Sequence, residues 1–174
     1  MKRSKAVALS LMGASALLLQ ACDDPEVEAK VYRDVKNCID TGDLTPEQCI
    51  DMHKEALKEH LQNAPRFASR DDCYAQFGAN DCQGYSNSSG GSVWLPLMMG
   101  FLASRALDSY SQGSAPLYRT RQAPGSLTTG TGYSVGDRYG STARLPEWAT
   151  QPTRSRTQTI SRGGFGARSS GWGG

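Results

Sequence analysis

The segments CIDTGDLTPEQC at residues 38–49 and CYAQFGANDC at residues 73–82 decide the predicted fold. Each segment begins and ends with cysteine and contains one glycine, and an aromatic residue, Tyr32 or Phe67, lies six residues before it. The two copies are 35 residues apart, so they form an internal repeat. Each copy predicts a short helix, a turn at the glycine, and a second cysteine.

The four cysteines of this repeat are predicted to form two disulfides, which is typical of an oxidising compartment. Local closure gives Cys38–Cys49 and Cys73–Cys82, whereas the alternative, Cys38–Cys82 with Cys49–Cys73, would join the two copies. A disulfide that closes a loop of this size stabilises a small domain by about 3 kcal/mol in the chain-entropy model. The sequence has no Cys-x-x-Cys pair and no Cys/His cluster at zinc spacing, so it indicates neither a metal site nor redox chemistry.

Spacing and capping residues predict helices at residues 26–38, 46–62 and 70–77. The first helix is predicted because Val27, Val31 and Val35 recur at a spacing of four. The second is predicted because Thr45 and Gln48 form a capping-box pattern around a proline. The third has only a short cap pattern, in which a serine is followed three residues later by aspartate.

The predicted architecture is mostly α and divides the chain into consecutive parts. A disulfide-stapled helical domain covers 26–84, a Gly/Ser linker covers 85–92, an apolar helical segment covers 93–110, and a disordered tail covers 111–174. The tail is predicted to be disordered because Gly, Ser, Thr and Pro make up 34 of its 64 residues and no periodic apolar pattern is visible.

The apolar segment is where we predict the functional contact. Residues 93–103 carry no charge, and burying one large apolar side chain is worth about 1.5–3 kcal/mol, so something must cover them. We leave three alternatives open for what covers these residues: the domain itself, a protein partner or a lipid surface. The predicted partner or membrane contact within 93–107 is made by Trp94, Met98, Met99, Phe101 and Leu102.

The first 21 residues are predicted to be an export signal that is removed. A basic start is followed by 14 uncharged residues, at 6–19, which are too few to span a bilayer as a helix. The sequence Leu19-Gln20-Ala21-Cys22 resembles the lipobox of bacterial lipoproteins. That resemblance implies lipidation of Cys22 with palmitate-type acyl chains, whose anchoring segment is 22–25, and cleavage after Ala21. An ordinary secretory signal or an uncleaved anchor are the alternatives.

The two residues after the lipobox predict which of the two bacterial membranes holds the protein. Asp23 and Asp24 resemble the sorting signal that keeps enterobacterial lipoproteins at the inner membrane. The predicted location is therefore the periplasmic face of the inner membrane, with the outer membrane as the alternative.

Charge is divided unequally along the chain. Residues 23–92 carry 14 acidic and 7 basic side chains, whereas residues 111–174 carry 8 arginines, 2 acidic residues and no lysine. Such a basic tail suits an anionic envelope surface or the acidic half of this same chain. A solvated spacer is the alternative, and export argues against nucleic acid as a partner.

Nothing in the sequence predicts catalysis. Only 28 of 174 residues are Leu, Ile, Val or Phe, which excludes an enzyme with a large core. His53 and His60 are seven residues apart on one predicted helix, so we interpret them as edges of its buried stripe and predict no metal. No catalytic residue and no cofactor is predicted.

The whole pattern resembles the enterobacterial YgiB family over nearly the full length. The residues that carry this resemblance are the lipobox around Cys22, Asp71-Asp72-Cys73 with Cys82, the segment from Trp94-Leu95-Pro96 to Met98-Met99-Gly100, and the Gly/Ser/Arg tail. The family supplies no activity, but its members are often encoded beside an ATP-grasp ligase resembling glutathionylspermidine synthase.

Two functional hypotheses follow. The first is a lipid-anchored envelope protein that acts as a non-catalytic binding or structural module. The second is an accessory or sensor protein for a peptide or polyamine ATP-grasp ligase. Carboxylates that converge in one cleft would favour the second hypothesis.

Overall fold

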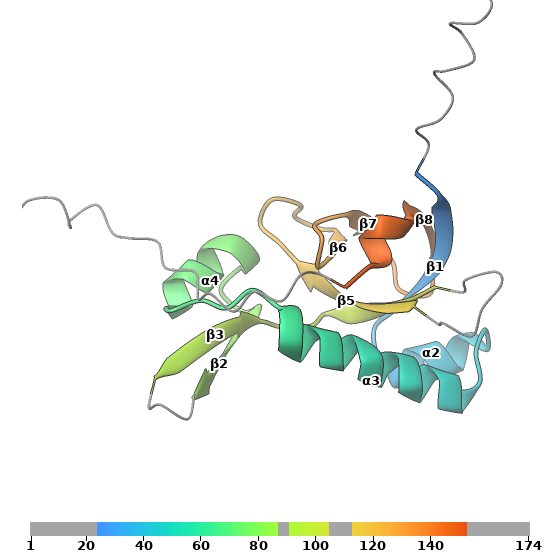
Figure 1. Ribbon diagram of the computed structural model, residues 1–174, viewed down its shortest axis with the longest axis horizontal. Helices are drawn as coiled ribbons and strands as arrows, with labels where there is room; N and C mark the ends of the chain where they lie inside the picture. The colour runs from blue at the N-terminus through green and yellow to red at the C-terminus, as the bar shows by residue number, and fades with distance from the viewer. Residues whose placement is uncertain (1–23, 87–90, 105–112, 153–174) are drawn as a thin grey trace, which may run out of the picture.

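The computed structural model describes residues 24–86, 91–104 and 113–152, which form two antiparallel sheets and three α-helices (Figure 1). The strand order in the large sheet is β7 (Ser134–Gly136), β6 (Leu127–Thr129), β5 (Gly113–Arg119), β4 (Gly100–Ser104), β1 (Glu26–Tyr32) and β8 (Thr142–Pro146). The small sheet pairs β2 (Cys82–Ser86) with β3 (Ser92–Pro96). The helices are α2 (Val35–Thr41), α3 (Pro46–Asn63) and α4 (Arg70–Phe77), and a 3-10 turn, η1 (Glu147–Thr150), follows β8. The prediction of a mostly α fold is therefore wrong.

The large sheet separates two hydrophobic cores. The sheet curves until its edge strands β7 and β8 approach each other, and η1 packs inside the curve. The inner core consists of Ala29, Val31, Leu102, Ala115, Leu117, Leu127, Leu145 and Ala149. On the outer face, helices α2 and α3 form a second core with Tyr32, Phe101 and Ala103 of the sheet.

The predicted helix at 26–38 is a strand followed by a short helix. The inner face of β1 carries Val27, Ala29 and Val31, and its outer face carries Glu26, Glu28 and Lys30. A spacing of four between valines fits both a helix and an alternating strand, so the valines alone do not distinguish the two. The alternation of charged and apolar residues is typical of a strand, and α2 begins only at Val35, where Asp34 caps it.

The predicted apolar helix at 93–110 forms β3 and β4 instead, and residues 105–110 lie outside the described part of the chain. A short uncharged run suits a strand that is buried on both faces as well as it suits a helix. Phe101 packs against α2 and α3, whereas Leu102 belongs to the inner core. A side-chain carbon at Gly100 would collide with the backbone oxygen of Tyr32, so glycine allows β4 to lie close to β1 at this point.

The predicted disordered tail at 111–174 contains four strands of the large sheet, β5 to β8. Strands β6, β7 and β8 are only three to five residues long, and glycine turns separate the strands, including Gly132 and Gly140 with φ of 92° and 81°. Each strand therefore contributes too few apolar residues for a periodic pattern to stand out. The last part of the predicted tail, 153–174, lies outside the described residues.

The predictions that rest on local capping and local disulfides are confirmed. The Thr45 side chain accepts a hydrogen bond from the Gln48 backbone N–H at 3.3 Å, and the Gln48 side chain accepts one from Thr45 N–H at 3.0 Å. In the same way, Ser69 caps α4. The disulfide Cys38–Cys49 joins α2 to α3, and Cys73–Cys82 joins α4 to β2.

The second disulfide belongs to a small third core, beside the hairpin of β2 and β3. Here Phe67 exchanges two backbone hydrogen bonds, each of 2.9 Å, with Trp94 of β3. The predicted linker at 85–92 contributes to both strands of this hairpin, and its residues 87–90 lie outside the described part of the chain.

Among the described helices, none combines the length and the apolar composition needed to cross a bilayer.

Candidate functional site

A cavity of about 430 Å³ lies on the outer face of the large sheet, alongside β1. This volume falls within the roughly 300–1,000 Å³ that is typical of small-molecule sites. Three carboxylates and one ammonium group line it, from Glu26, Glu28, Asp43 and Lys30. Apolar side chains form much of the remaining lining, among them Leu44, Met52 and Ala103, and Tyr32 also borders the cavity. The cavity therefore combines an apolar floor with charged groups, an arrangement suited to binding.

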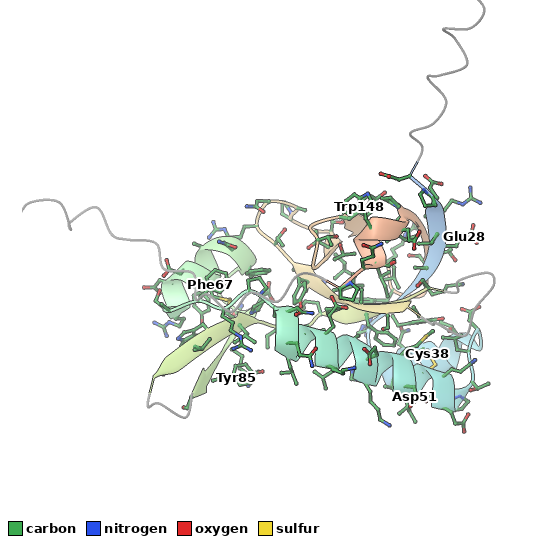
Figure 2. The ribbon with its side chains drawn as sticks, viewed as in Figure 1. Glu28, Cys38, Asp51, Phe67, Tyr85 and Trp148 are labelled. Carbon is green, nitrogen blue, oxygen red and sulfur yellow. A yellow bond between two sulfur atoms is a disulfide. The ribbon has the colours of Figure 1, made fainter. Side chains whose placement is uncertain are left out.

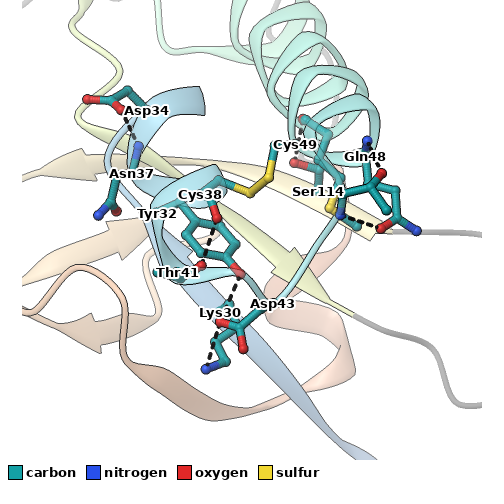
Figure 3. The surroundings of a disulfide bond; sticks show 12 residues. Lys30, Tyr32, Asp34, Asn37, Cys38, Thr41, Asp43, Gln48, Cys49 and Ser114 are labelled. Atoms are coloured by element: carbon teal, nitrogen blue, oxygen red, sulfur yellow. Dashed lines mark hydrogen bonds and ion pairs between the residues drawn. A yellow bond between two sulfur atoms is a disulfide. The ribbon is translucent and has the colours of Figure 1, made fainter.

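The loop between α2 and α3 forms one wall of this cavity. Helix α2 ends at Gly42, which adopts a left-handed conformation with φ of 71° and turns the chain toward Asp43 and Leu44. The Cys38–Cys49 disulfide spans this turn, as Figure 3 shows. Because the disulfide fixes both ends of the turn, it also fixes the wall of the cavity.

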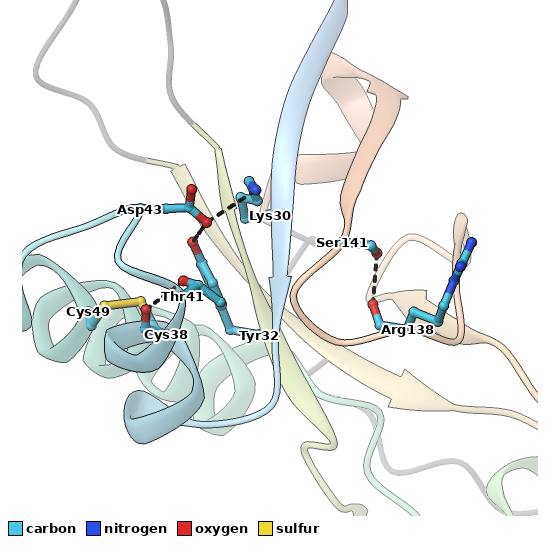
Figure 4. Close-up of polar contacts among 8 residues, drawn as sticks. All are labelled: Lys30, Tyr32, Cys38, Thr41, Asp43, Cys49, Arg138 and Ser141. Atoms are coloured by element: carbon cyan, nitrogen blue, oxygen red, sulfur yellow. Dashed lines mark hydrogen bonds and ion pairs between the residues drawn. A yellow bond between two sulfur atoms is a disulfide. The ribbon is translucent and has the colours of Figure 1, made fainter.

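An ion pair joins this loop to β1 across the cavity (Figure 4). Lys30 Nζ lies 3.1 Å from Asp43 Oδ2, and the Tyr32 hydroxyl donates a long hydrogen bond of 3.5 Å to the same oxygen. The hydrogen bond from Lys30 is the main reason why the pKa of Asp43 is lowered. Burial is the main reason why the pKa of Tyr32 is raised. Asp43 is therefore held as a carboxylate at neutral pH, and Tyr32 as a neutral phenol.

The rim of the cavity is acidic. Glu28, labelled in Figure 2, accepts a hydrogen bond from Arg144 of β8, with Nε at 3.0 Å from Oε1. Within the described residues, Glu26 has no ion-pair partner. Two of the three carboxylates are thus already compensated by cations of the fold, and Glu26 supplies the remaining negative charge.

A second polar cluster is buried between α3 and β5. His60 Nδ1 lies 3.1 Å from the Tyr118 hydroxyl, and both side chains are almost fully buried, as is the neighbouring Glu59. Burial lowers the pKa of His60. Burial, and then the charge of Glu59, raise the pKa of Tyr118. These groups pack within the fold and do not line the cavity, so we assign them a structural role.

This cluster predicts acid sensitivity. A neutral His60 in the folded state has a pKa below 6.5, whereas the unfolded chain takes up a proton as the pH falls through 6.5. The free energy of unfolding should therefore decrease below about pH 6.5, by at most about 1.4 kcal/mol per pH unit for this one group. Urea unfolding between pH 7 and 5.5 measures this slope.

His60→Gln should flatten this slope, because the amide can still hydrogen-bond to Tyr118 but does not titrate. His53→Gln is the matched control on the same helix, since the His53 ring contacts Phe101 and not Tyr118. Equal slopes in the wild type and in His60→Gln would show that His60 does not control the acid response.

The structure separates the predicted contact residues into two groups. Phe101 and Leu102 are 0% and 1% exposed, so both are core residues of the large sheet. Trp94, Met98 and Met99 are half-buried, and their predicted contact role stays a prediction. None of the five lines the cavity.

The predicted lipidation and sorting residues lie at or before the first described residue, Asp24. Cys22 and Asp23, together with the predicted signal at 1–21, fall outside the described residues, and Asp24 is exposed. Within the described residues, no group of three or more His, Cys, Asp or Glu side chains is placed to hold a metal ion.

Sequence reasoning missed the cavity. The signal that could have revealed one wall is the alternation in Glu26–Tyr32, which places Glu26, Glu28 and Lys30 on one face of a strand. The sequence around Asp43 does not predict its contact with Lys30, because the α2–α3 loop reaches β1 only through the packing of α2 and α3 on the sheet.

Comparisons with known proteins identify a family. The family described as "Protein of unknown function (DUF1190)" matches residues 26–173. A UPF0441 protein of Serratia proteamaculans is 30% identical to this chain, and the alignment covers 92% of this chain and 79% of that protein. A UPF0441 protein of Sodalis glossinidius is 31% identical, with coverages of 91% and 79%. No solved structure matches the chain. The chain therefore belongs to the DUF1190 family, together with the UPF0441 proteins, and the predicted membership of the YgiB family is confirmed.

Proposed function

We propose that this protein is an exported, lipid-anchored envelope protein that binds a small ligand without catalysing a reaction, and that the cavity alongside β1 is its binding site. The observation that carries the proposal is the combination of an apolar floor with a charged rim in one cavity of about 430 Å³. Its polar groups are carboxylates, an ammonium and a phenol, which suit the orientation of a ligand.

Export is supported by independent features of the chain. The basic start, the apolar run and Cys22 occur in the order that a lipoprotein signal requires. Two disulfides suit an oxidising compartment. Cys22 precedes Glu26 by four residues, a span of at most about 14 Å, so a lipid on Cys22 would hold the cavity near the membrane surface.

The anchor is tested by substitution. Cys22→Ser is expected to abolish palmitate labelling and to leave the signal uncleaved, because the lipidated sulfur directs both steps. Wild-type protein should label and should fractionate with the inner membrane, as Asp23 and Asp24 predict. Wild-type protein that is unlabelled and soluble would contradict the anchor.

The cavity is tested by filling it. Leu44→Trp should displace a small molecule that remains bound when full-length protein is extracted from envelopes, and native mass spectrometry measures the loss of that adduct. Leu57→Trp is the matched control, since Leu57 is exposed on α3 and lies outside the cavity. An adduct that persists in Leu44→Trp, or its absence from the wild type, would refute the cavity as the site.

A second candidate function is an accessory or sensor role beside a peptide or polyamine ligase. The observation that favours it is that Glu26, Glu28 and Asp43 line one cavity. Calorimetric titration with spermidine tests this role. Saturable binding that Glu26→Gln weakens would support it, and the absence of spermidine binding would remove it.

A further inference from the structure

The carboxylate-lined cavity has a candidate occupant within the same chain. Residues 153–174 follow the last described residue and contain four arginines, no lysine and no acidic residue. At the rim of the cavity, by contrast, Glu26 and Glu28 are two residues apart on the outer face of β1. The two surfaces are therefore complementary in charge.

The chain passes beside β1 shortly before this segment begins. Pro146 of β8 pairs with Glu26, and the backbone N–H of Glu147 donates a hydrogen bond of 2.8 Å to the carbonyl of Pro25. The short turn η1 then packs against β8 and β5 inside the curve of the sheet and leads to Pro152, so the segment must pass around the edge of the sheet to reach the cavity on the outer face. An extended chain of 22 residues reaches at most about 75 Å, so every part of the cavity lies within its range.

The family match includes most of this segment. It extends over residues 26–173, so the basic segment belongs to the same matched unit as β1 and the cavity. A tethered segment also needs little intrinsic affinity, because a short flexible tether gives an effective concentration of roughly millimolar order.

We propose that the arginine-rich segment 153–174 docks within its own chain into the cavity alongside β1, where a guanidinium group pairs with Glu26. Arginine suits this cavity because its aliphatic stem packs on Leu44 and Met52 while its planar head pairs with a carboxylate. The docked segment competes with any ligand of the cavity. The inference uses the cavity of the proposed function, but it does not require that a ligand exists.

Photocrosslinking in the full-length protein tests this docking. A p-benzoylphenylalanine in place of Phe165 is irradiated in the presence of vesicles that contain phosphatidylglycerol, and crosslinked peptides are mapped by mass spectrometry. We expect crosslinks within one chain to the peptides of β1 and of the α2–α3 loop. Their yield should fall at least threefold in 1 M salt and in Glu26→Gln.

Matched variants separate specific pairing from general charge. Asp51→Asn with Glu55→Gln removes two exposed carboxylates of α3 that lie outside the cavity, and should leave the yield unchanged. Replacing Arg154, Arg156, Arg162 and Arg168 by glutamine should lower the yield.

Three results would overturn the docking proposal: crosslinks only to phosphatidylglycerol, crosslinks only between chains, or an intrachain yield that Glu26→Gln does not change. None of these results bears on whether Leu44→Trp displaces a small molecule. The failure of this inference is therefore distinguishable from failure of the proposed function.

Discussion

Leu102→Glu is expected to unfold the protein under conditions in which the wild type is folded. Leu102 lies on β4 in the inner core and is 1% exposed. Replacing a buried leucine by alanine already costs about 2–5 kcal/mol, and glutamate adds the cost of burying a carboxyl group. Folded proteins are stable by only about 5–15 kcal/mol, so one such change is decisive. Circular dichroism and urea unfolding measure the loss.

The matched control for this substitution is Leu57→Glu on α3. Leu57 is 39% exposed, so the same chemical change should alter the free energy of unfolding by no more than about 0.5 kcal/mol. If Leu102→Glu were equally harmless, β4 could not be part of the core. The comparison also bears on the contact predicted for residues 93–107, since a surface contact residue would tolerate glutamate without unfolding.

Removal of the Cys38–Cys49 disulfide, by Cys38→Ala with Cys49→Ala, is expected to cost about 3 kcal/mol of unfolding free energy. The bond closes a loop of sequence separation 11, and both sulfurs are fully buried between α2 and α3. Its loss should also release the loop that holds Asp43 against Lys30. Hydrogen exchange at the backbone amides of this loop should therefore accelerate by more than the global destabilisation explains.

The second disulfide provides the comparison. Cys73→Ala with Cys82→Ala opens a loop of similar length, so its cost in unfolding free energy should also be about 3 kcal/mol. That bond lies in the core of α4, β2 and β3, away from the cavity, so exchange in the α2–α3 loop should change only through global stability. Equal local acceleration in both double variants would show that Cys38–Cys49 does not specifically support the cavity.

Capping and loop closure are local properties, which explains why those predictions hold. At the start of α3, the side chains of Thr45 and Gln48 accept hydrogen bonds from backbone groups three residues away. The Cys38–Cys49 disulfide closes a loop of sequence separation 11. The strands depend on distant partners instead. β1 pairs with β4 on one side and with β8 on the other, and no feature of its own sequence identifies either neighbour.

The candidate site is hidden from the sequence for the same reason. Glu26, Glu28 and Lys30 read as one face of a strand, but their cavity exists only because the α2–α3 loop and α3 pack over that face. The polar pair of His60 and Tyr118 is likewise formed by residues 58 positions apart. The identity of each residue is visible in the sequence, whereas the partner that gives it a role is set by tertiary packing.

The position of β1 between β4 and β8 also determines when the fold can be completed. β1 precedes both of its neighbours along the chain, so Ala29 can pair only once Ser104 on one side and Ala143 on the other have entered the compartment in which the protein folds. Both disulfides join cysteines that emerge close together, so they can close while the sheet is still open. In a chain that ends before β8, β1 keeps an unpaired edge that another chain can occupy, so molecules truncated before Thr142 should be prone to aggregation.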